Sequence, residues 1–322
     1  MPEQRKLVFL FSGQGSHYYQ MGRDLFEQRG SFHRHAVEVD SLFREALGTS
    51  VLKIIYDPRR KISDPFDRTV LTHAAIFLVE YALAKALIDD GLRPDYALAT
   101  SMGAFAALVL AESLSVEQAI LALITQARLL DVHCVAGGML ALAGVERQRV
   151  EAFARRFDCE LASVNPWTTC VLAGDQARLA GAETVLRNEN IGYQRLAVSR
   201  AFHSRWIDAA ATPYRTFLAS LHLRPPHIPI VCCAESGILR EIPAAYLWDV
   251  VRKPIRFDDT VNTLCRAEPM LLVDVGPSGT LATSLKYLPP HSVADYQVQA
   301  VLSPFGGGAA RYEWVLAKSR SS

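Results

Sequence analysis

The stretch "LATSMGAFAAL", residues 98–108, contains the pattern that decides the fold. An apolar run leads into Ser101, and Gly103 begins a second apolar run of helical composition. A serine on a sharp strand-to-helix turn needs small residues two positions before and two after it, because side chains there crowd the neighbouring backbone. Ala99 and Gly103 occupy these positions. The stretch therefore predicts a strand, a tight turn and a helix, with Ser101 as either a nucleophile or a small turn residue.

The segments on both sides of this turn alternate between strands and helices. "KLVFLFSGQGS", which begins at residue 6, is an apolar run followed by a glycine-rich turn, and helical patterns follow at about 31–47 and 70–90. Ser115 and Gln118 form a capping box that predicts the start of another helix. This alternation is typical of a mainly parallel sheet covered by helices. We therefore expect an α/β fold with a large α/β-hydrolase-like domain.

From residue 137 the pattern changes to strand, helix, strand, strand, helix, strand, which is the order of a ferredoxin-like unit. We expect a small ferredoxin-like domain at residues 137–199, inserted between the two parts of the large domain at 1–136 and 200–322. The second part is expected to contain a long helix from about 205 and strands at 228–235 and 269–279. The tail at 304–314 has a loose, glycine-rich composition.

The amino-acid composition limits the classes of function that the protein can have. Half of the 322 residues are hydrophobic and only 21% are charged, which favours a large buried core. The net charge of +1 gives no uniform field for nucleic acid or an anionic membrane. The apolar run that ends at Ser12 is too short for a signal peptide or a membrane span, so we expect a cytoplasmic protein. The six cysteines form no CxxC pair and HExxH is absent, so we expect no metal site.

A nucleophilic serine needs a base within hydrogen-bond reach, usually a histidine. Two arrangements are open from the residues alone. Asp274 and His291 follow Ser101 in the order of an α/β-hydrolase. His203, just past the expected small domain, is the other candidate base.

From the first strand to about residue 285, the chain resembles the malonyl-CoA:acyl carrier protein transacylase family, which includes polyketide synthase acyltransferase domains. The resemblance rests on seven motifs in family order: "FSGQGSHYYQMG", "TSMGAFAA", "MLAL", "ASVN", "VSRAFHS", "WDVVRKPIRF" and "VDVGPSGTL". It implies that Ser101 is the acylated nucleophile and His203 its base in a Ser-His dyad. The family orients this histidine through a backbone carbonyl, which the resemblance implies near Val275 and Gly276.

The resemblance also implies an oxyanion hole and a substrate cleft. The backbone N–H groups of Gln14 and Met102 would stabilise the tetrahedral oxygen. Asn165 matches a position that lines the family's cleft, although a turn residue before proline is an equally good interpretation. Phe202, beside the base, is a candidate to restrict branched acyl groups, and core packing explains an aromatic there equally well.

Three positions depart from the malonyl-specific pattern: Thr100, Ala104 and Gln126 stand where the family usually has His, Glu and Arg. The family's Arg pairs with the free carboxylate of a malonyl group. Glutamine lacks the charge and the bidentate fork of arginine, and an unpaired buried carboxylate costs several kcal/mol. We therefore expect neutral acyl groups, as in the trans-acting, proofreading acyl hydrolases of polyketide biosynthesis that this chain resembles.

Three hypotheses about the function remain open at this point. In the first, the enzyme acts on neutral acyl groups, and the acyl-serine is released to water by an editing hydrolase or passed to another carrier thiol by a transferase. The second is a malonyl-CoA transacylase, and the third is a non-catalytic carrier-protein adaptor. The expected partners are acyl carrier protein domains and an acyl thioester. No cofactor is expected, because coenzyme A or phosphopantetheine enters only as part of the substrate. Basic residues that are candidates to dock an acidic carrier are Arg155, Arg156, Arg200, Arg205, Arg252 and Lys253.

Overall fold

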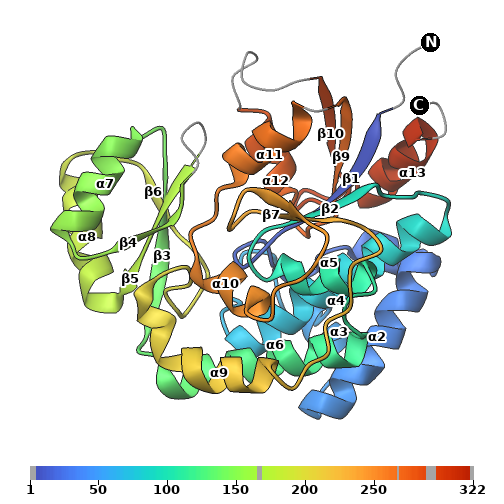
Figure 1. Cartoon of the computed structure of the whole chain (residues 1–322), viewed down its shortest axis with the longest axis horizontal. Coiled ribbons are helices and arrows are strands. Elements are labelled where there is room, and N and C mark those ends of the chain that lie inside the picture. The colour runs from blue at the N-terminus through green and yellow to red at the C-terminus, as the bar shows by residue number, and fades with distance from the viewer. Residues whose placement is uncertain (1–4, 165–168, 267, 288–294, 320–322) are drawn as a thin grey trace.

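A six-stranded sheet forms the centre of the protein (Figure 1). The computed structural model describes residues 5–164, 169–266, 268–287 and 295–319. The strand order is β10-β9-β1-β2-β7-β8; the first five strands are parallel and β8 is antiparallel to β7. The strands are β1 (Lys6–Phe11), β2 (Tyr96–Ala99), β7 (Ile230–Cys232), β8 (Gly237–Leu239), β9 (Met270–Asp274) and β10 (Tyr296–Ala300).

Strand β1 shows why the sheet is covered on both faces. Leu7, Phe9 and Phe11 point into the larger apolar core, whereas Val8 and Leu10 belong to a second core on the other side. Side chains alternate along a strand, so a strand buried on both faces has a continuous apolar sequence. The helices are α1 (Arg23–Glu27), α2 (Ser31–Leu47), α3 (Val51–Ile55), α4 (Thr69–Asp89), α5 (Gly103–Leu110), α6 (Val116–His133), α9 (Ala211–Leu218), α10 (Tyr246–Arg252), α11 (Phe257–Cys265), α12 (Thr280–Leu285) and α13 (Gly308–Ser319).

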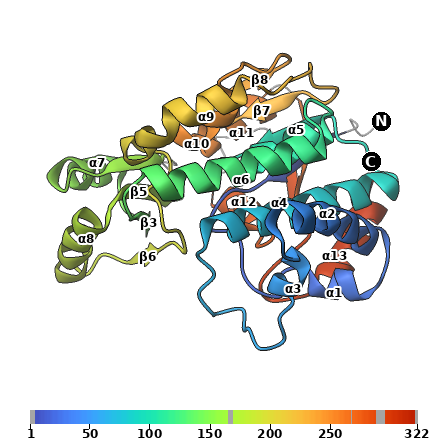
Figure 2. The same cartoon turned by 90° about the horizontal axis from the view of Figure 1, so that it is seen from below.

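Helix α4 is long and apolar enough to cross a membrane by length and composition alone. Most of its residues are nevertheless buried inside the protein, where α4 packs against α2, α5 and α6 (Figure 2). A helix that is apolar on nearly all sides is expected at the centre of a large core. Helix α4 is therefore the central core helix of this fold.

Strands β3 to β6 with helices α7 and α8, residues 137–195, form what we call the small unit, which lies to the left in Figure 1. Its elements follow the strand and helix order that the sequence predicts, and its sheet has the order β4-β5-β3-β6 with antiparallel pairs throughout. The unit has an apolar core of its own. The elements are β3 (Gly137–Ala143), α7 (Arg147–Arg156), β4 (Glu160–Ser163), β5 (Thr169–Asp175), α8 (Gln176–Asn188) and β6 (Tyr193–Arg195).

Two expectations for the C-terminal part are wrong. The long helix expected from about 205 is a short 3₁₀ helix, Arg205–Ala210, followed by α9. Pro213 explains the break, because proline lacks an N–H and fits only in the first turn of an α-helix. The loose tail contains most of α13, whose Tyr312, Val315 and Leu316 are buried, and its glycines precede or begin that helix.

Candidate active site

Ser101 lies at the tip of the turn between β2 and α5, as predicted. Its φ is 53°, in the left-handed region that few non-glycine residues adopt. Glycines make this close turn possible. A Cβ at Gly103 would lie 2.6 Å from the carbonyl oxygen of Phe11, and one at Gly13 would lie 2.6 Å from the Cβ of Ser101. The turn therefore packs directly against the end of β1 and the loop that follows it.

His203 contacts Ser101 from the chain segment that follows the small unit. Its Nε2 lies 2.8 Å from the Ser101 Oγ, and its Nδ1 lies 2.8 Å from the carbonyl oxygen of Lys253. A carbonyl oxygen only accepts hydrogen bonds, so Nδ1 carries the proton and donates it. This leaves Nε2 as the acceptor for the Ser101 hydroxyl. The pair has the geometry of a nucleophile and its general base.

Burial sets the proton affinity of His203. The ring is 2% exposed, and this burial lowers the pKa of His203 to about 4. The hydrogen bond to the Lys253 carbonyl raises the pKa, and the nearby positive charge of Arg252 lowers it. His203 is therefore neutral at neutral pH and ready to accept the serine proton.

The rate of Ser101 acylation is expected to be constant around neutral pH and to fall as the pH drops through about 4. The reason is that protonated His203 accepts no further proton, and its lowered pKa displaces this loss below the ordinary value of 6.5. Brief incubation with an activated ester at each pH, followed by intact-mass measurement of the acyl-enzyme, tests this. An inflection near the ordinary value would contradict it.

The carbonyl that orients His203 comes from a different place than expected. The backbone N–H of Val275 donates to Leu10, and that of Gly276 donates to the Asp274 carboxylate at 2.8 Å, so this turn joins β9 to β1. The orienting carbonyl belongs instead to Lys253, directly after α10. The motif at 248–257, which contains Lys253, is recognisable in the sequence. That its Lys253 carbonyl faces His203 depends on how α10 packs.

The α/β-hydrolase arrangement with Asp274 is not what the described residues show. The fully buried Asp274 carboxylate accepts from the backbone N–H groups of Gly276 and Ala282. The ring nitrogens of His203 contact Ser101 and Lys253 instead of a carboxylate. His291 lies outside the described residues.

Gln14 and Met102, the residues expected to form the oxyanion hole, both belong to segments next to Ser101. Met102 precedes the first residue of α5, and Gln14 follows Gly13, which touches Ser101. Among the contacts of the described residues, neither backbone N–H donates to another protein group. The Gln14 side chain points away to Thr72, with its Nε2 3.1 Å from the Thr72 Oγ1. Both N–H groups thus remain available to an oxygen at the site.

A cleft of about 450 Å³ opens beside Ser101 between the large sheet and the small unit. Thr100 and Phe202, two of the predicted substrate contacts, are among the residues that line it. No lysine or arginine belongs to the described lining. The lining comprises residues 12–16, Thr100, Ser101, Met139, Ala141, Ser163, Thr169, Val171, Gln194, Leu196, Phe202, His203, Ile255, Thr280, Leu281, Thr283 and Ser284.

Gln126, a further predicted substrate contact, is not among the described lining residues. It is 1% exposed on α6, and neither atom of its side-chain amide has a partner in hydrogen-bond geometry. Burial raises the pKa of the Tyr214 hydroxyl, and the nearby Gln126 amide lowers it. Gln126 thus faces the packing between α6 and α9. Asn165, the last predicted contact, lies outside the described residues.

Glu80 is a site component that sequence reasoning missed. Its carboxylate accepts from both the backbone N–H and the hydroxyl of Ser12, each at 2.7 Å, and so holds the loop that carries Gly13 and Gln14. Glu80 is fully buried, and burial raises its pKa well above the usual range. A carboxyl group in the middle of the apolar helix at 69–89 was the signal available in the sequence.

Most of the candidate docking cations are engaged within the protein. Lys253 pairs with Glu235 at 2.8 Å, and Arg200 pairs with Asp131 at 2.9 Å. Arg205 and Arg252 belong to a network beside His203. These four side chains therefore act first in internal ion pairs.

Comparison with known proteins identifies the family. A family profile described as "Acyl transferase domain" matches residues 8–305. The chain belongs to this acyl transferase family. The match confirms the family resemblance drawn from the seven motifs, and the strand-to-helix turn, Ser101 and His203 lie within the matched residues.

Two curated relatives of this acyl transferase family member span nearly its whole length. The "Polyketide biosynthesis acyltransferase homolog BaeD" of Bacillus velezensis is 40% identical over 299 residues, covering 93% of this chain and 92% of BaeD. The "Polyketide biosynthesis acyltransferase homolog PksD" of Bacillus subtilis is 37% identical over 300 residues, with 93% of this chain and 92% of PksD covered.

Solved structures support the same acyl transferase fold. The acyltransferase domain from the second module of the salinomycin polyketide synthase is similar, with a TM-score of 0.83 at 27% identity, covering 98% of this chain and 73% of that one. FabD from Acinetobacter baumannii has a TM-score of 0.83 at 22% identity and 99% coverage of both chains. At that identity the second comparison shows the fold alone.

Proposed function

We propose that this protein removes neutral acyl groups from acyl carrier protein thioesters in polyketide biosynthesis. The acyl group passes through an ester on Ser101 and is released to water or to another carrier thiol. The observation that carries this proposal is the Ser101–His203 pair at 2.8 Å, placed in a cleft whose described lining has no lysine or arginine. The printed names of BaeD and PksD supply the biosynthetic setting.

The dyad geometry supports acylation by a direct route. The Ser101 Oγ attacks the thioester carbonyl while His203 Nε2 takes the serine proton. The backbone N–H groups of Gln14 and Met102 stabilise the negative oxygen of the tetrahedral intermediate, and loss of one such donor costs about 3 kcal/mol of transition-state stabilisation in comparable enzymes. The intermediate then expels the pantetheine thiolate, which receives the proton from His203. The product is an acyl-serine and a free carrier thiol.

Deacylation decides between hydrolase and transferase. His203 takes a proton from water or from a second thiol, which attacks the ester carbonyl and expels Ser101 Oγ, and the serine recovers its proton from His203. We propose water as the acceptor, as in the editing hydrolases that the chain resembles, and transfer to a second thiol is the outcome that the experiment below separates from it.

The charge of the cleft supports the choice of acyl group. A malonyl group has a free carboxylate, and transfer of a carboxylate from water into a partly enclosed site is unfavourable unless a positive side chain pairs with it. The described lining offers hydroxyl, amide and apolar groups but no cation. Acetyl, butyryl and longer uncharged chains meet no such penalty.

Two other functions follow from different assumptions about the site. A malonyl transacylase would need a side chain that pairs with the malonyl carboxylate. Gln126 does not meet this need, because it is buried and is not among the described lining residues of the cleft. A non-catalytic carrier adaptor would not need the Ser101–His203 contact or the lowered pKa of His203. The first observation argues against the malonyl transacylase, and the second argues against the adaptor.

We also infer the finer features of the fold and setting. The sheet order β4-β5-β3-β6 and the separate core support a ferredoxin-like insert at 137–199 within an α/β-hydrolase-like domain at 1–136 and 200–322. The thioester supplies the activated bond, so we propose no cofactor beyond the pantetheine or coenzyme A of the substrate. We propose a cytoplasmic enzyme, because acyl carrier proteins are its partners.

Intact-mass spectrometry on carrier proteins loaded with acetyl, butyryl or malonyl groups tests the proposal. We expect catalytic amounts of the protein to unload acetyl and butyryl carriers at least about 100-fold faster than the malonyl carrier, since an unpaired charge costs several kcal/mol. Ser101→Ala is the control and should unload none of them.

The fate of the acyl group is read from the same mixtures after addition of a second, unloaded carrier. Free acid without transfer supports the editing hydrolase, and acylation of the second carrier supports the transferase. Rapid accumulation of malonyl on Ser101 would contradict the preference for neutral groups. Carrier binding without an acyl-serine from any of the three substrates would favour the adaptor.

A further inference from the structure

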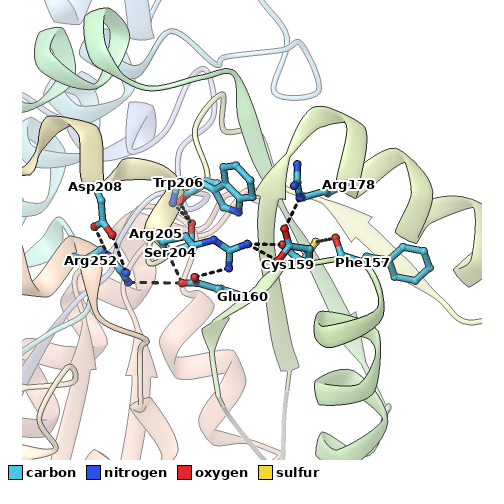
Figure 3. A network of polar contacts seen from close by, with 11 residues as sticks. Phe157, Cys159, Glu160, Arg178, Ser204, Arg205, Trp206, Asp208 and Arg252 are labelled. Carbon is cyan, nitrogen blue, oxygen red and sulfur yellow. Dashed lines mark hydrogen bonds and ion pairs between the residues drawn. The ribbon is translucent and has the colours of Figure 1, made fainter.

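A network of ion pairs joins the small unit to the segments on both sides of the dyad (Figure 3). Glu160, at the start of β4, is its central carboxylate. It accepts from the backbone N–H and the guanidinium of Arg205, each at 2.9 Å. The same carboxylate lies 3.7 Å from the guanidinium of Arg252. One side chain of the small unit therefore contacts two separate segments of the chain that follows this unit.

These two segments carry the two partners of the orienting hydrogen bond. Arg205 follows His203 by two residues, and Arg252 directly precedes Lys253. The bond between the His203 Nδ1–H and the Lys253 carbonyl therefore lies between two chain segments that are both held by Glu160. A shift of either segment would lengthen or rotate this bond.

Backbone hydrogen bonds join the small unit to the same region. Ile255 donates to the carbonyl of Ala162 at 2.9 Å, and Val164 donates to the carbonyl of Ile255 at 3.0 Å. The chain after Lys253 thus continues the edge of β4 as a parallel bridge. Glu160 and these bonds fix β4 against the segment that orients the base.

The backbone of His203 needs such support. Its φ is 60°, a left-handed conformation that costs a non-glycine residue free energy and persists only when its surroundings enforce it. On one side, the N–H of His203 donates to Val251 at 2.9 Å. On the other, the Ser204 hydroxyl donates to the Ala201 carbonyl at 2.6 Å, and Glu160 of the small unit accepts from the N–H of Arg205 at 2.9 Å.

We propose that Glu160 is a positioning residue, which holds the backbone around His203 and Lys253 so that the histidine ring is aligned on Ser101. Through Glu160, the position of the small unit relative to the six-stranded sheet sets the alignment of the His203 ring. This inference rests on the proposed Ser101–His203 dyad. Glu160 itself is not a lining residue of the cleft, so it acts through the chain and not on substrate.

The other contacts of the network keep the region folded without Glu160. Arg205 also pairs with Asp158 at 2.5 Å, and Arg252 pairs with Asp208 at 2.5 Å. The guanidinium groups of Arg178 and Arg205 each lie over the ring of Trp206. Partly exposed ion pairs contribute little to stability. Removing the charge of Glu160 is therefore expected to change the geometry around His203 much more than the unfolding transition.

Glu160→Gln tests the proposal against Glu151→Gln as a matched control. Glu151 is similarly exposed and also pairs with an arginine, Arg147, but within α7 of the small unit. The measured quantity is the rate of Ser101 acylation by p-nitrophenyl acetate at neutral pH, where His203 is unprotonated. We expect a loss of about 10-fold for Glu160→Gln, because small misplacements of a catalytic group slow reactions by one to two orders of magnitude. Glu151→Gln should retain the parent rate.

A second readout does not depend on the reaction. The ring N–H of His203 gives a proton resonance in ¹⁵N-histidine-labelled protein, assigned by its loss in His203→Asn. We expect this resonance to shift or broaden in Glu160→Gln and to stay unchanged in Glu151→Gln. If the parent protein shows no Ser101-dependent acylation, the proposed function fails, and the resonance still decides the inference about Glu160.

Arg205→Gln and the double variant complete the test. If Glu160 acts through Arg205, the double variant should lose little more than either single variant. Unchanged acylation and an unchanged resonance in Glu160→Gln would overturn the proposal. A loss matched by a collapse of the unfolding midpoint would also overturn it, because a structural role alone then suffices. Fully additive losses in the double variant would overturn it as well, because Glu160 would then act independently of Arg205.

Discussion

Replacement of His203 by alanine is expected to slow acylation of Ser101 about 10³- to 10⁴-fold. His203 is the group whose ring nitrogen lies 2.8 Å from the Ser101 Oγ, and its lowered pKa leaves it free to accept the proton at neutral pH. Without it, the hydroxyl must lose its proton to solvent. The rate of acyl-enzyme formation from p-nitrophenyl butyrate, followed by intact mass, measures this loss.

Two controls separate the dyad from its alternatives. Ser101→Ala should form no acyl-enzyme, because the attacking oxygen is gone. His291→Ala should keep the parent rate, since among the described residues Ser101 contacts His203 and Asp274 accepts from the backbone N–H groups of Gly276 and Ala282. An equal loss from His291→Ala and little loss from His203→Ala would restore the α/β-hydrolase arrangement with Asp274.

Replacement of Gly103 by alanine is expected to lower the free energy of unfolding by about 3 kcal/mol, at the upper end of the cost of overpacking a core. The added Cβ would lie 2.6 Å from the carbonyl oxygen of Phe11. That oxygen belongs to β1, a central strand paired with β2 and β9, and has little freedom to move. Helix α5 must therefore shift away from the sheet, and Ser101 with it. Urea unfolding measures the loss, and acylation by an activated ester should fall in parallel.

Gly192→Ala is the matched control for this substitution. No atom lies within 4 Å of a Cβ at Gly192, so the same change should alter the free energy of unfolding by no more than about 0.5 kcal/mol. Equal stability of Gly103→Ala and the parent protein would show that α5 and β1 adapt easily. The tight turn would then not explain why glycine stands at this position.

Local sequence patterns predicted the elements that depend on neighbouring residues. Ser115 and Gln118 form the capping box expected from their spacing, and β1 has the continuous apolar sequence of a strand buried on both faces. The six cysteines are all buried in the structure. The break before α9 and the helix in the tail were missed, because there a proline position and tertiary burial outweigh local composition.

The pairing of Ser101 with His203 is a different case. These residues are 102 positions apart, and the residues alone left His291 equally open; only the resemblance to the transacylase family favoured His203. The same resemblance misplaced the orienting carbonyl, which Lys253 supplies. It also led to Gln126 as a substrate contact, although this side chain is buried outside the described lining of the cleft.

The sequence by itself determined the turn at Ser101, the order of strands and helices through the small unit and the absence of a strong net charge. Each of these depends on residue types at short spacing or on composition. Only the tertiary structure decided which carbonyl orients His203, that no cation lines the described cleft and that Glu160 contacts both sides of the base. These features join segments far apart in the chain, and such contacts arise only when the packing of the two sheets fixes distances and directions between them.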